Sequence, residues 1–164
     1  MTDLFDQTTT IKTLTIWQPW ASLFAAGVKR HETRHWATPY RGPIAIHAGL
    51  TLDGVGAPEA LCRAALGKHW RGVLPVGMVL AIGDLTACVD ARRLAPSLTK
   101  ADLAAGNFAE GRYAWRVDNI RPLTRPIPAT GRQGIWNWEP PANLGALLCP
   151  VIDHQAACRY IGWA

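Results

Sequence analysis

Lys29, Glu32 and Arg34 bring a cation, a carboxylate and a second cation together within six residues of the chain. Such a set can hold a phosphate or the edge of a base, or it can transfer protons. The same spacing also fits an internal ion pair, Glu32 with Arg34 or with Lys29, that stabilises the start of a strand. Charge clusters are often only structural, so from spacing alone we favour the ion pair, and both interpretations stand at this point.

A strand, a short helix and a glycine are expected to position this cluster. Residues 12–17 alternate in a β pattern, in which Thr13, Thr15 and Trp17 point to one face and Leu14 and Ile16 to the other. Pro19 then begins a helix, and Gly27 ends it. A second strand is expected over 31–36, where side chains alternate, so the carboxylate and the arginine of the cluster share one face.

The remaining chain predicts further short strands and a few helices. Strands are expected at 44–48, 76–89, 113–119 and 134–138, with a loop at 49–56. Helices are expected at 58–66 and 98–105, the second with Thr99 as its cap and Asp102 completing a capping box. These elements fit a single α+β, barrel-like domain over 11–141. Residues 1–10 are expected to be a disordered N-terminal segment, and 142–164 a tail packed on the domain, helical near 154–160.

Composition excludes two classes of protein. Hydrophobic residues make up 49% of the 164 residues and charged residues 18%, which excludes an extended disordered chain. The longest apolar candidate, 76–89, is interrupted by Asp84 and is too short for a membrane span. The N-terminus has no apolar segment typical of a secretion signal, so we expect a cytoplasmic protein without a membrane partner.

The charge balance favours a polyanionic partner. The chain carries 17 Lys and Arg against 12 Asp and Glu, a net charge of +5, and most of the cations are arginines. The arginines at 112, 116, 121, 125 and 132 recur through the last third, where they form either a phosphate-tracking stripe or the outer faces of two strands.

Metal and cofactor sites are not expected. The four cysteines contain no C-x-x-C pair and are interpreted as buried small hydrophobic residues. His31 and His35 would lie about 13 Å apart on a strand, too far to share one metal. His47 is interpreted as a satisfied core histidine. No P-loop, Rossmann glycine pattern or nucleophile elbow is present.

Eight tryptophans are an unusual number for this length. Most are expected to build the core, because each ring buries roughly 150–250 Å². One or two are expected to line a site on which bases stack. Trp36 shares its predicted strand face with Glu32 and Arg34, so we expect it to border the same cleft.

The region from 14 to 138 resembles the ASCH domain family, a branch of the PUA-like superfamily. The resemblance rests on Gln18-Pro19-Trp20-Ala21, on Gly27-x-Lys29-x-x-Glu32-x-Arg34, on the 38–42 turn and on the strands at 46–48 and 77–84. The insert at 50–75 and the tail contribute least to it. The resemblance implies a small β-barrel with flanking helices and a cleft at the glycine-lysine motif. RNA or another nucleic acid is the expected ligand, bound by Lys29, Arg30, Arg34, Trp36 and Arg41.

The family also has catalytic branches, which imply alternatives. One removes acyl groups from modified cytidines with a threonine three residues after the motif lysine; here that position is Glu32, which weakens this alternative, although Ser22 offers a nearby hydroxyl. Others resemble metal-independent ribonucleases, for which Lys29, Glu32 and Tyr40, beside Arg34, would supply the acid, base and cation. A sensor that binds a modified nucleoside without turnover is a third alternative.

Overall fold

The computed structural model describes residues 10–52 and 56–153, and the chain folds there into one mixed sheet with helices around it. The strands are β1 (Ile11–Gln18), β2 (His31–Arg34), β3 (Gly42–Leu52), β4 (Met78–Asp90), β5 (Tyr113–Pro128) and β6 (Ile135–Trp138). The helices are α1 (Trp20–Ala25), α2 (Glu59–Leu66), α3 (Ala91–Leu94), α4 (Lys100–Ala104) and α5 (Leu144–Leu147), with short 3₁₀ turns at Trp70–Gly72 and Ala95–Ser97.

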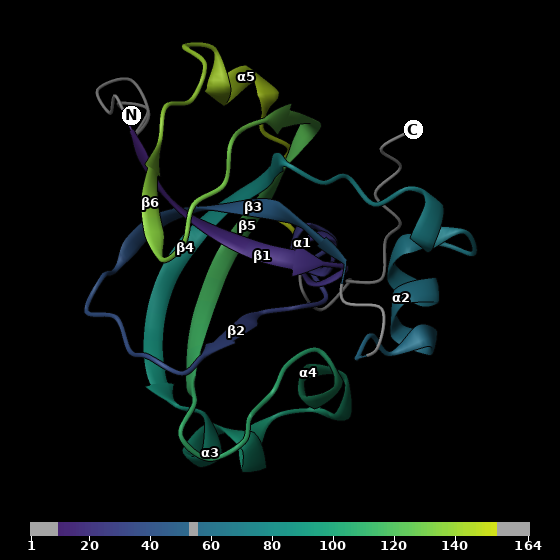
Figure 1. Cartoon of the computed structure of the whole chain (residues 1–164), viewed down its shortest axis with the longest axis vertical. Helices are drawn as coiled ribbons and strands as arrows, with labels where there is room; N and C mark the ends of the chain where they lie inside the picture. The colour runs from purple at the N-terminus through teal and green to yellow at the C-terminus, as the bar shows by residue number, and fades with distance from the viewer. Residues whose placement is uncertain (1–9, 53–55, 154–164) are drawn as a thin grey trace.

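The sheet has the strand order β2-β5-β4-β3-β1-β6. Only β1 and β3 run parallel, and the other neighbours are antiparallel. In Figure 1 the long strands β4 and β5 lie side by side while β1 and β3 cross in front of them, so the sheet is strongly twisted. The two edge strands, β2 and β6, form no ladder with each other in the described part of the chain. The α+β class is therefore confirmed, whereas closure into a barrel is not.

The main core lies between the sheet and α1. The even-numbered residues Leu14 and Ile16 of β1 are buried in it together with Phe24 of α1 and Trp115 of β5. The odd-numbered Trp17 is 56% exposed, as the alternating pattern of this strand predicts. From Leu14 onward β1 therefore has one face in the core and one face available for a site, whereas at the start of the strand Ile11 and Thr13 are buried and Lys12 is exposed.

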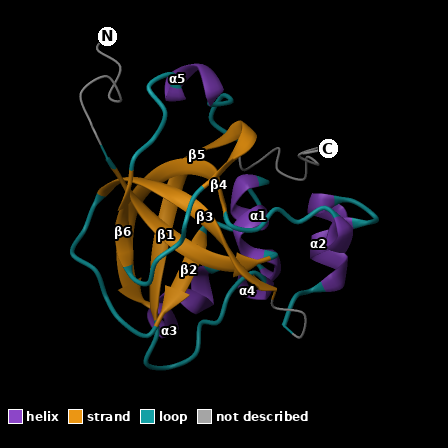
Figure 2. Ribbon diagram, turned by 45° about the horizontal axis from the view of Figure 1, so that its top comes forward, coloured by secondary structure: helices purple, strands orange, loops and turns teal. Residues whose placement is uncertain are grey.

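The helices α2 and α5 lie outside this core. Helix α2 and the 3₁₀ turn that follows it pack on α1, with Leu23, Cys62 and Trp70 in one cluster, and Figure 2 shows α2 beyond α1 as seen from the sheet. Helix α5 lies at the other end, where Leu144 packs with Trp138 in a second cluster. Neither helix lies between the sheet and the predicted cluster of charges. No described helix is long and apolar enough to cross a membrane.

Both ends of α1 are determined by residues of the sequence motif. The Gln18 side chain accepts a hydrogen bond from the Ser22 backbone at 3.0 Å and so caps the first turn. After the helix, Gly27 adopts a φ of +75°, and a Cβ there would lie 2.5 Å from Ile152. Lys29, two residues further on, donates its backbone N–H back to the Leu23 carbonyl. The predicted glycine stop is thus confirmed, and it delivers Lys29 to the start of β2.

Several predicted boundaries are wrong, while most predicted elements exist. The helix expected at 98–105 is α4, with the capping box between Thr99 and Asp102. The loop expected at 49–56 begins later, because β3 continues to Leu52 through its parallel pairing with β1. The strand expected to end at 119 continues to Pro128, since β4 supplies a partner along that length.

Other differences concern two short helices and the burial of the cysteines, which the local sequence pattern does not indicate. Helices α3 and α5 were not expected; both are single turns. Of the cysteines, Cys62 is buried, whereas Cys88 and Cys149 are only half-buried, and all three are free thiols. The frayed segment predicted up to residue 10 and the tail helix predicted near 154–160 fall almost entirely outside the described residues.

Candidate functional site

The Glu32 carboxylate lies between two cations. Its Oε2 is 3.4 Å from Lys29 Nζ, and its Oε1 is 3.0 Å from Arg34 Nε. Both ion pairs considered from the spacing are therefore present. Their setting differs from a surface pair, because Lys29 is only 2% exposed. Exposure of the side chains rises from Lys29 through Glu32, at 12%, to Arg34, at 27%, so Arg34 is the member that solvent reaches best.

Burial dominates the electrostatics of Lys29. It lowers the pKa of the ammonium group, as do the charges of Arg34 and Arg112, and Glu32 offsets part of this effect. The ammonium nitrogen also lies 5.5 Å from the ring centre of Trp20 and 5.4 Å from that of Phe24. The motif tryptophan and the motif lysine thus pack together.

The loop after α4 covers Lys29 and is attached to β2. Lys29 Nζ donates a hydrogen bond to the Ala105 carbonyl. The Asn107 backbone donates to Thr33 Oγ1 at 3.2 Å, and Arg112 Nη2 donates to the Thr33 carbonyl at 2.7 Å. These contacts connect residues more than 70 positions apart. They convert an exposed strand start into the floor of a pocket.

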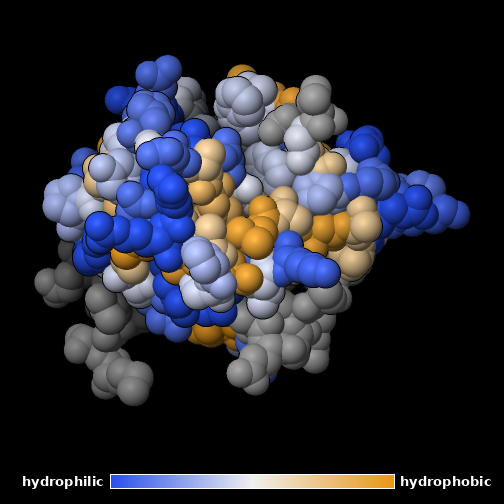
Figure 3. Space-filling view, turned by 90° about the horizontal axis from the view of Figure 1, so that it is seen from below, coloured by the Kyte–Doolittle hydropathy of each residue, from blue (hydrophilic) through white to orange (hydrophobic). Residues whose placement is uncertain are grey.

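Two adjoining pockets open at this place. The smaller, of about 480 Å³, is lined by the charged cluster, Trp20 and the loop after α4; the larger, of about 1170 Å³, is lined by the outward face of β1, by His47 of β3 and by residues 128–134. Trp17, Arg34 and His35 line both pockets. We call the two together the groove. Figure 3 views the end of the molecule that carries α3 and α4, where hydrophobic surface in the centre is flanked by hydrophilic residues.

A buried histidine forms the inner wall of the larger pocket. His47 Nε2 lies 2.9 Å from the Ala129 carbonyl, which assigns the proton to Nε2. The predicted satisfied histidine is satisfied at this nitrogen only, because Nδ1 has no hydrogen-bond partner among the described residues. Burial lowers the pKa of His47. A Cβ at Gly131 would lie 2.6 Å from the imidazole, so the 128–134 segment approaches this ring as closely as glycine allows.

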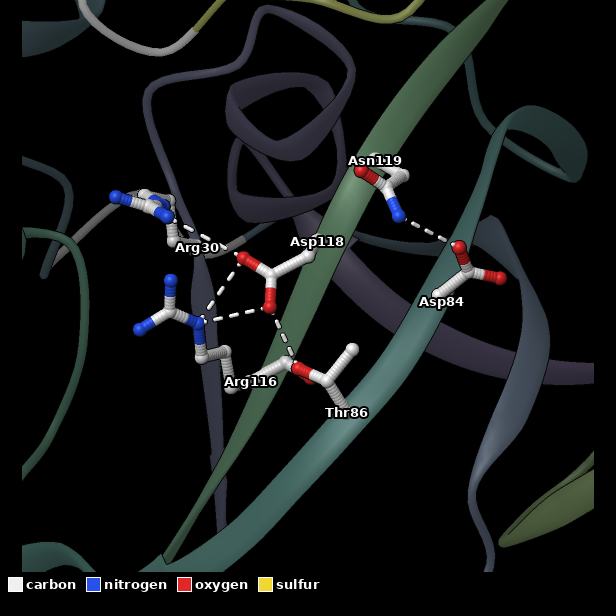
Figure 4. A network of polar contacts seen from close by, with 6 residues as sticks. All are labelled: Arg30, Asp84, Thr86, Arg116, Asp118 and Asn119. Atoms are coloured by element: carbon white, nitrogen blue, oxygen red, sulfur yellow. Dashed lines mark hydrogen bonds and ion pairs between the residues drawn. The ribbon is translucent and has the colours of Figure 1, made fainter.

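Arg30, a predicted nucleic-acid ligand, lies in a different polar network. The Asp118 carboxylate of β5 accepts hydrogen bonds from Arg30 at 3.2 Å, from Arg116 at 2.8 Å and from the Thr86 hydroxyl at 2.6 Å. Figure 4 shows these three donors around the carboxylate. Although burial opposes it, this set of donors lowers the pKa of Asp118 to about 2. Arg30 lines neither pocket. The structure therefore separates it from Lys29, its neighbour in sequence.

The structure also separates Tyr40 and Arg41 from the groove. The Tyr40 hydroxyl donates to the Pro43 carbonyl, and Arg41 donates to the Thr38 carbonyl at 3.0 Å and to that of Tyr40. Neither residue lines either pocket.

Trp36 does line the larger pocket. Its ring packs edge-on against Trp115, with ring centres 4.5 Å apart. Trp36 therefore borders the groove and also supports the core.

Part of the groove comes from residues that the local sequence pattern does not assign to a site. Among the five arginines that recur in the last third, Arg112 lines the smaller pocket and Arg132 the larger, whereas Arg121 donates to the Cys149 carbonyl. The period-two pattern of β1 places Trp17 on the face away from the core, so this pattern could have identified Trp17 as a residue of the groove. No group of three or more His, Cys, Asp or Glu side chains in the described ranges is arranged to hold a metal ion.

The twisted α+β sheet and the groove beside the glycine-lysine motif define the class of protein. The model of the ASCH domain matches residues 14–126, and the chain belongs to the ASCH domain family. It is similar to a solved structure titled ASCH from Zymomonas mobilis, with a TM-score of 0.53 and 17% identity over 88% of this chain and 100% of that chain. At this identity the likeness concerns the fold.

Two curated relatives share a segment with this chain. The proteins named Activating signal cointegrator 1 from Homo sapiens and Mus musculus are each 28% identical over 138 residues. The aligned segment covers 81% of this chain and 23% of each relative. The chain thus spans about a quarter of the length of these relatives.

Proposed function

We propose that the chain binds RNA in the groove. The observation that carries this proposal is the charge of the residues that line the two pockets. Four of them are cations, namely Lys29, Arg34, Arg112 and Arg132, and one is a carboxylate, Glu32. A concave surface with this excess of positive charge attracts a phosphate backbone. The RNA ligand implied by the family resemblance agrees with it.

The members of the charged cluster have different roles in this proposal. Lys29 is buried and uses its ammonium group on Glu32 and Ala105, so it positions the carboxylate rather than meeting a phosphate. Glu32 in turn orients Arg34, whose Nη2 also donates to the Thr15 carbonyl at 2.8 Å. A guanidinium held in this way loses little freedom when it binds an anion. Arg34 is the phosphate contact at the centre of the groove.

The outer contacts of the proposed interface come from both pockets. Arg112 serves the smaller pocket and Arg132 the larger, and Trp36 borders the larger one. Arg30 and Arg41 are left out of the interface, because one pairs with Asp118 and the other is bound to backbone carbonyls.

Binding of a labelled RNA oligonucleotide to charge-removing variants tests the proposal. Arg34→Gln, Arg112→Gln and Arg132→Gln should each weaken binding about fivefold, corresponding to about 1 kcal/mol for an exposed charge contact. Arg93→Gln is the matched control, because Arg93 is exposed on α3 and lines neither pocket. Wild-type affinity in all three groove variants, or tighter binding of the corresponding DNA strand, would contradict RNA binding here.

A second candidate is hydrolysis at the same cluster. The specific observation is that Glu32 lines a pocket of about 480 Å³ beside a lysine whose pKa is lowered. This volume suits one nucleoside. Glu32 would accept the proton of the attacking water, or of the 2′-hydroxyl in RNA, and return it to the leaving group, while Lys29 would stabilise the negative charge that develops on the substrate. Tyr40 has no part in this candidate, since its hydroxyl is bound to Pro43 away from the pocket.

Turnover assays separate the two candidates. Labelled RNA and N4-acetylcytidine are incubated with the wild-type protein and with Glu32→Gln. Hydrolysis of either substrate that disappears in Glu32→Gln, while RNA binding persists, supports the enzyme. Binding without product in the wild-type protein supports the binding module alone.

A further inference from the structure

Trp17 occupies a position that the core does not explain. It is the exposed member of the described tryptophans, at 56%, whereas Trp70, Trp115 and Trp138 are buried and Trp20, Trp36 and Trp136 are half-buried. Its side chain stands on the outward face of β1 and lines both pockets. A large aromatic ring left in water at the junction of two cationic pockets is available to a ligand.

The surroundings of Trp17 combine an apolar face with positive charge. Leu50 of the neighbouring strand β3 is 80% exposed and lines the larger pocket beside it. Arg34 lines both pockets with Trp17, and Arg132 lies in the larger one. No carboxylate lines the larger pocket in the described part of the chain. An aromatic ring flanked by arginines is the arrangement that binds a base by stacking and its phosphates by charge.

The size of the groove exceeds one nucleoside. Pockets for small ligands usually measure about 300–1000 Å³. The smaller pocket, of about 480 Å³, lies within this range, and the larger, of about 1170 Å³, lies above it. Because they adjoin at Trp17, Arg34 and His35, a ligand that fills both must continue past the indole.

We infer that Trp17 is a stacking platform and that the groove takes a single-stranded segment of at least two nucleotides. One nucleotide lies in each pocket, and a base stacks on the Trp17 indole between them. A duplex does not fit this role, because its bases are already stacked and paired inside the helix. The inference rests on the proposed RNA binding and specifies the form of the ligand.

A length series of oligouridylates tests the inference. Uridine monophosphate, the dinucleotide and the tetranucleotide are titrated against the wild-type protein, Trp17→Ala and Trp17→Phe. Affinity should rise steeply from the mononucleotide to the longer strands. Trp17→Ala should weaken tetranucleotide binding at least fivefold, which corresponds to about 1 kcal/mol, the lower end for stacking of a base on an aromatic ring. Trp17→Phe should restore most of the affinity.

Two controls make the outcome specific to stacking. Leu52→Ala removes an exposed apolar side chain from the adjacent strand end that lines neither pocket, and it should bind like the wild type. A tetranucleotide with abasic positions should bind equally to the wild type and to Trp17→Ala. Thermal melting of each variant confirms that it is folded.

The failure of this inference is distinguishable from failure of the proposed function. Two results would contradict the stacking role: Trp17→Ala binds the single strand as tightly as the wild-type protein does, or the wild-type protein binds a duplex as tightly as the single strand. If Arg34→Gln still weakens binding in that case, RNA binding stands. If no oligonucleotide binds the wild-type protein, the proposed function itself fails.

Discussion

The contribution of Lys29 to stability depends on how deeply its charged group is buried. An exposed ion pair with Glu32 would contribute at most about 1 kcal/mol to stability. Here the ammonium group is 2% exposed and is held by Glu32, Ala105 and the rings of α1. Removing the lysine takes one of the two cations from the Glu32 carboxylate, leaves the Ala105 carbonyl without its donor and creates a cavity. The stability of the loop after α4 therefore depends on this side chain.

Replacement of Lys29 should reveal this dependence. Lys29→Ala should lower the free energy of unfolding by about 3–5 kcal/mol, whereas Lys29→Met should lower it less, because methionine fills the space that alanine leaves empty. Glu32 keeps its pairing with Arg34 in both variants. Chemical denaturation measures both. Lys68→Ala, at an exposed position, is the control and should change stability by less than about 0.5 kcal/mol. A loss below about 1 kcal/mol in Lys29→Ala would show that the pair behaves as a surface pair.

His31 should make stability depend on pH. Burial, and secondarily the charge of Arg116, lower its pKa from 6.5 to about 4. Between these values the unfolded chain binds the proton and the folded one does not, so stability falls as the pH drops from about 6.5 towards 4, by up to about 3 kcal/mol. Denaturant midpoints measured across this window should fall less steeply in His31→Gln. Equal slopes in both proteins would show that His31 is not protected in the folded state.

At the scale of elements, the fold that surrounds the groove depends on close approaches of the backbone at two glycines. Gly27 ends α1 in the left-handed region and directs the chain to β2. Gly83 lies in β4, where a Cβ would come 2.7 Å from Val117 and 2.8 Å from Ile120 of β5. Both glycines allow elements to pack more closely than a side chain would permit.

Alanine at these two positions should destabilise the protein. Gly27→Ala must adopt a left-handed conformation and contacts Ile152, and Gly83→Ala overpacks the β4–β5 interface, so each should lose about 1–3 kcal/mol. Gly72→Ala is the matched control, since no atom lies within 4 Å of the added methyl. Thermal melting compares the three. Melting temperatures that do not differ from that of Gly72→Ala would contradict the close packing.

At the scale of the whole molecule, the net charge of +5 and the cationic groove act together. Distributed charge increases the rate of encounter with a polyanion, and the arginines in the groove decide where the phosphates lie. Both contributions weaken with salt, but only specific contacts set the number of released counterions.

RNA affinity should therefore fall linearly with the logarithm of salt concentration. Arg112→Gln and Arg132→Gln should each reduce the slope of this plot by about 0.7, the value for one contact to a single-stranded phosphate. Dissociation constants measured from low to physiological salt give the slopes. A wild-type affinity that does not respond to salt would exclude a polyanionic ligand.

The local features of this chain could be predicted from sequence because they depend on neighbouring residues. The alternation in the second half of β1, the glycine that ends α1 and the capping box at Thr99 and Asp102 follow from backbone sterics and short-range hydrogen bonds. The motif around Lys29 also sufficed to predict the family.

The composition of the groove was decided only by the tertiary structure. Arg112 and Arg132 reach it from loops whose positions depend on long-range pairing between strands, and Lys29 is buried because Ala105 folds over it. Tyr40 turns away because the Pro43 carbonyl, three residues on, accepts its hydroxyl. Periodicity tells which side chains share a face of a strand, but what covers that face depends on contacts between residues far apart in the chain.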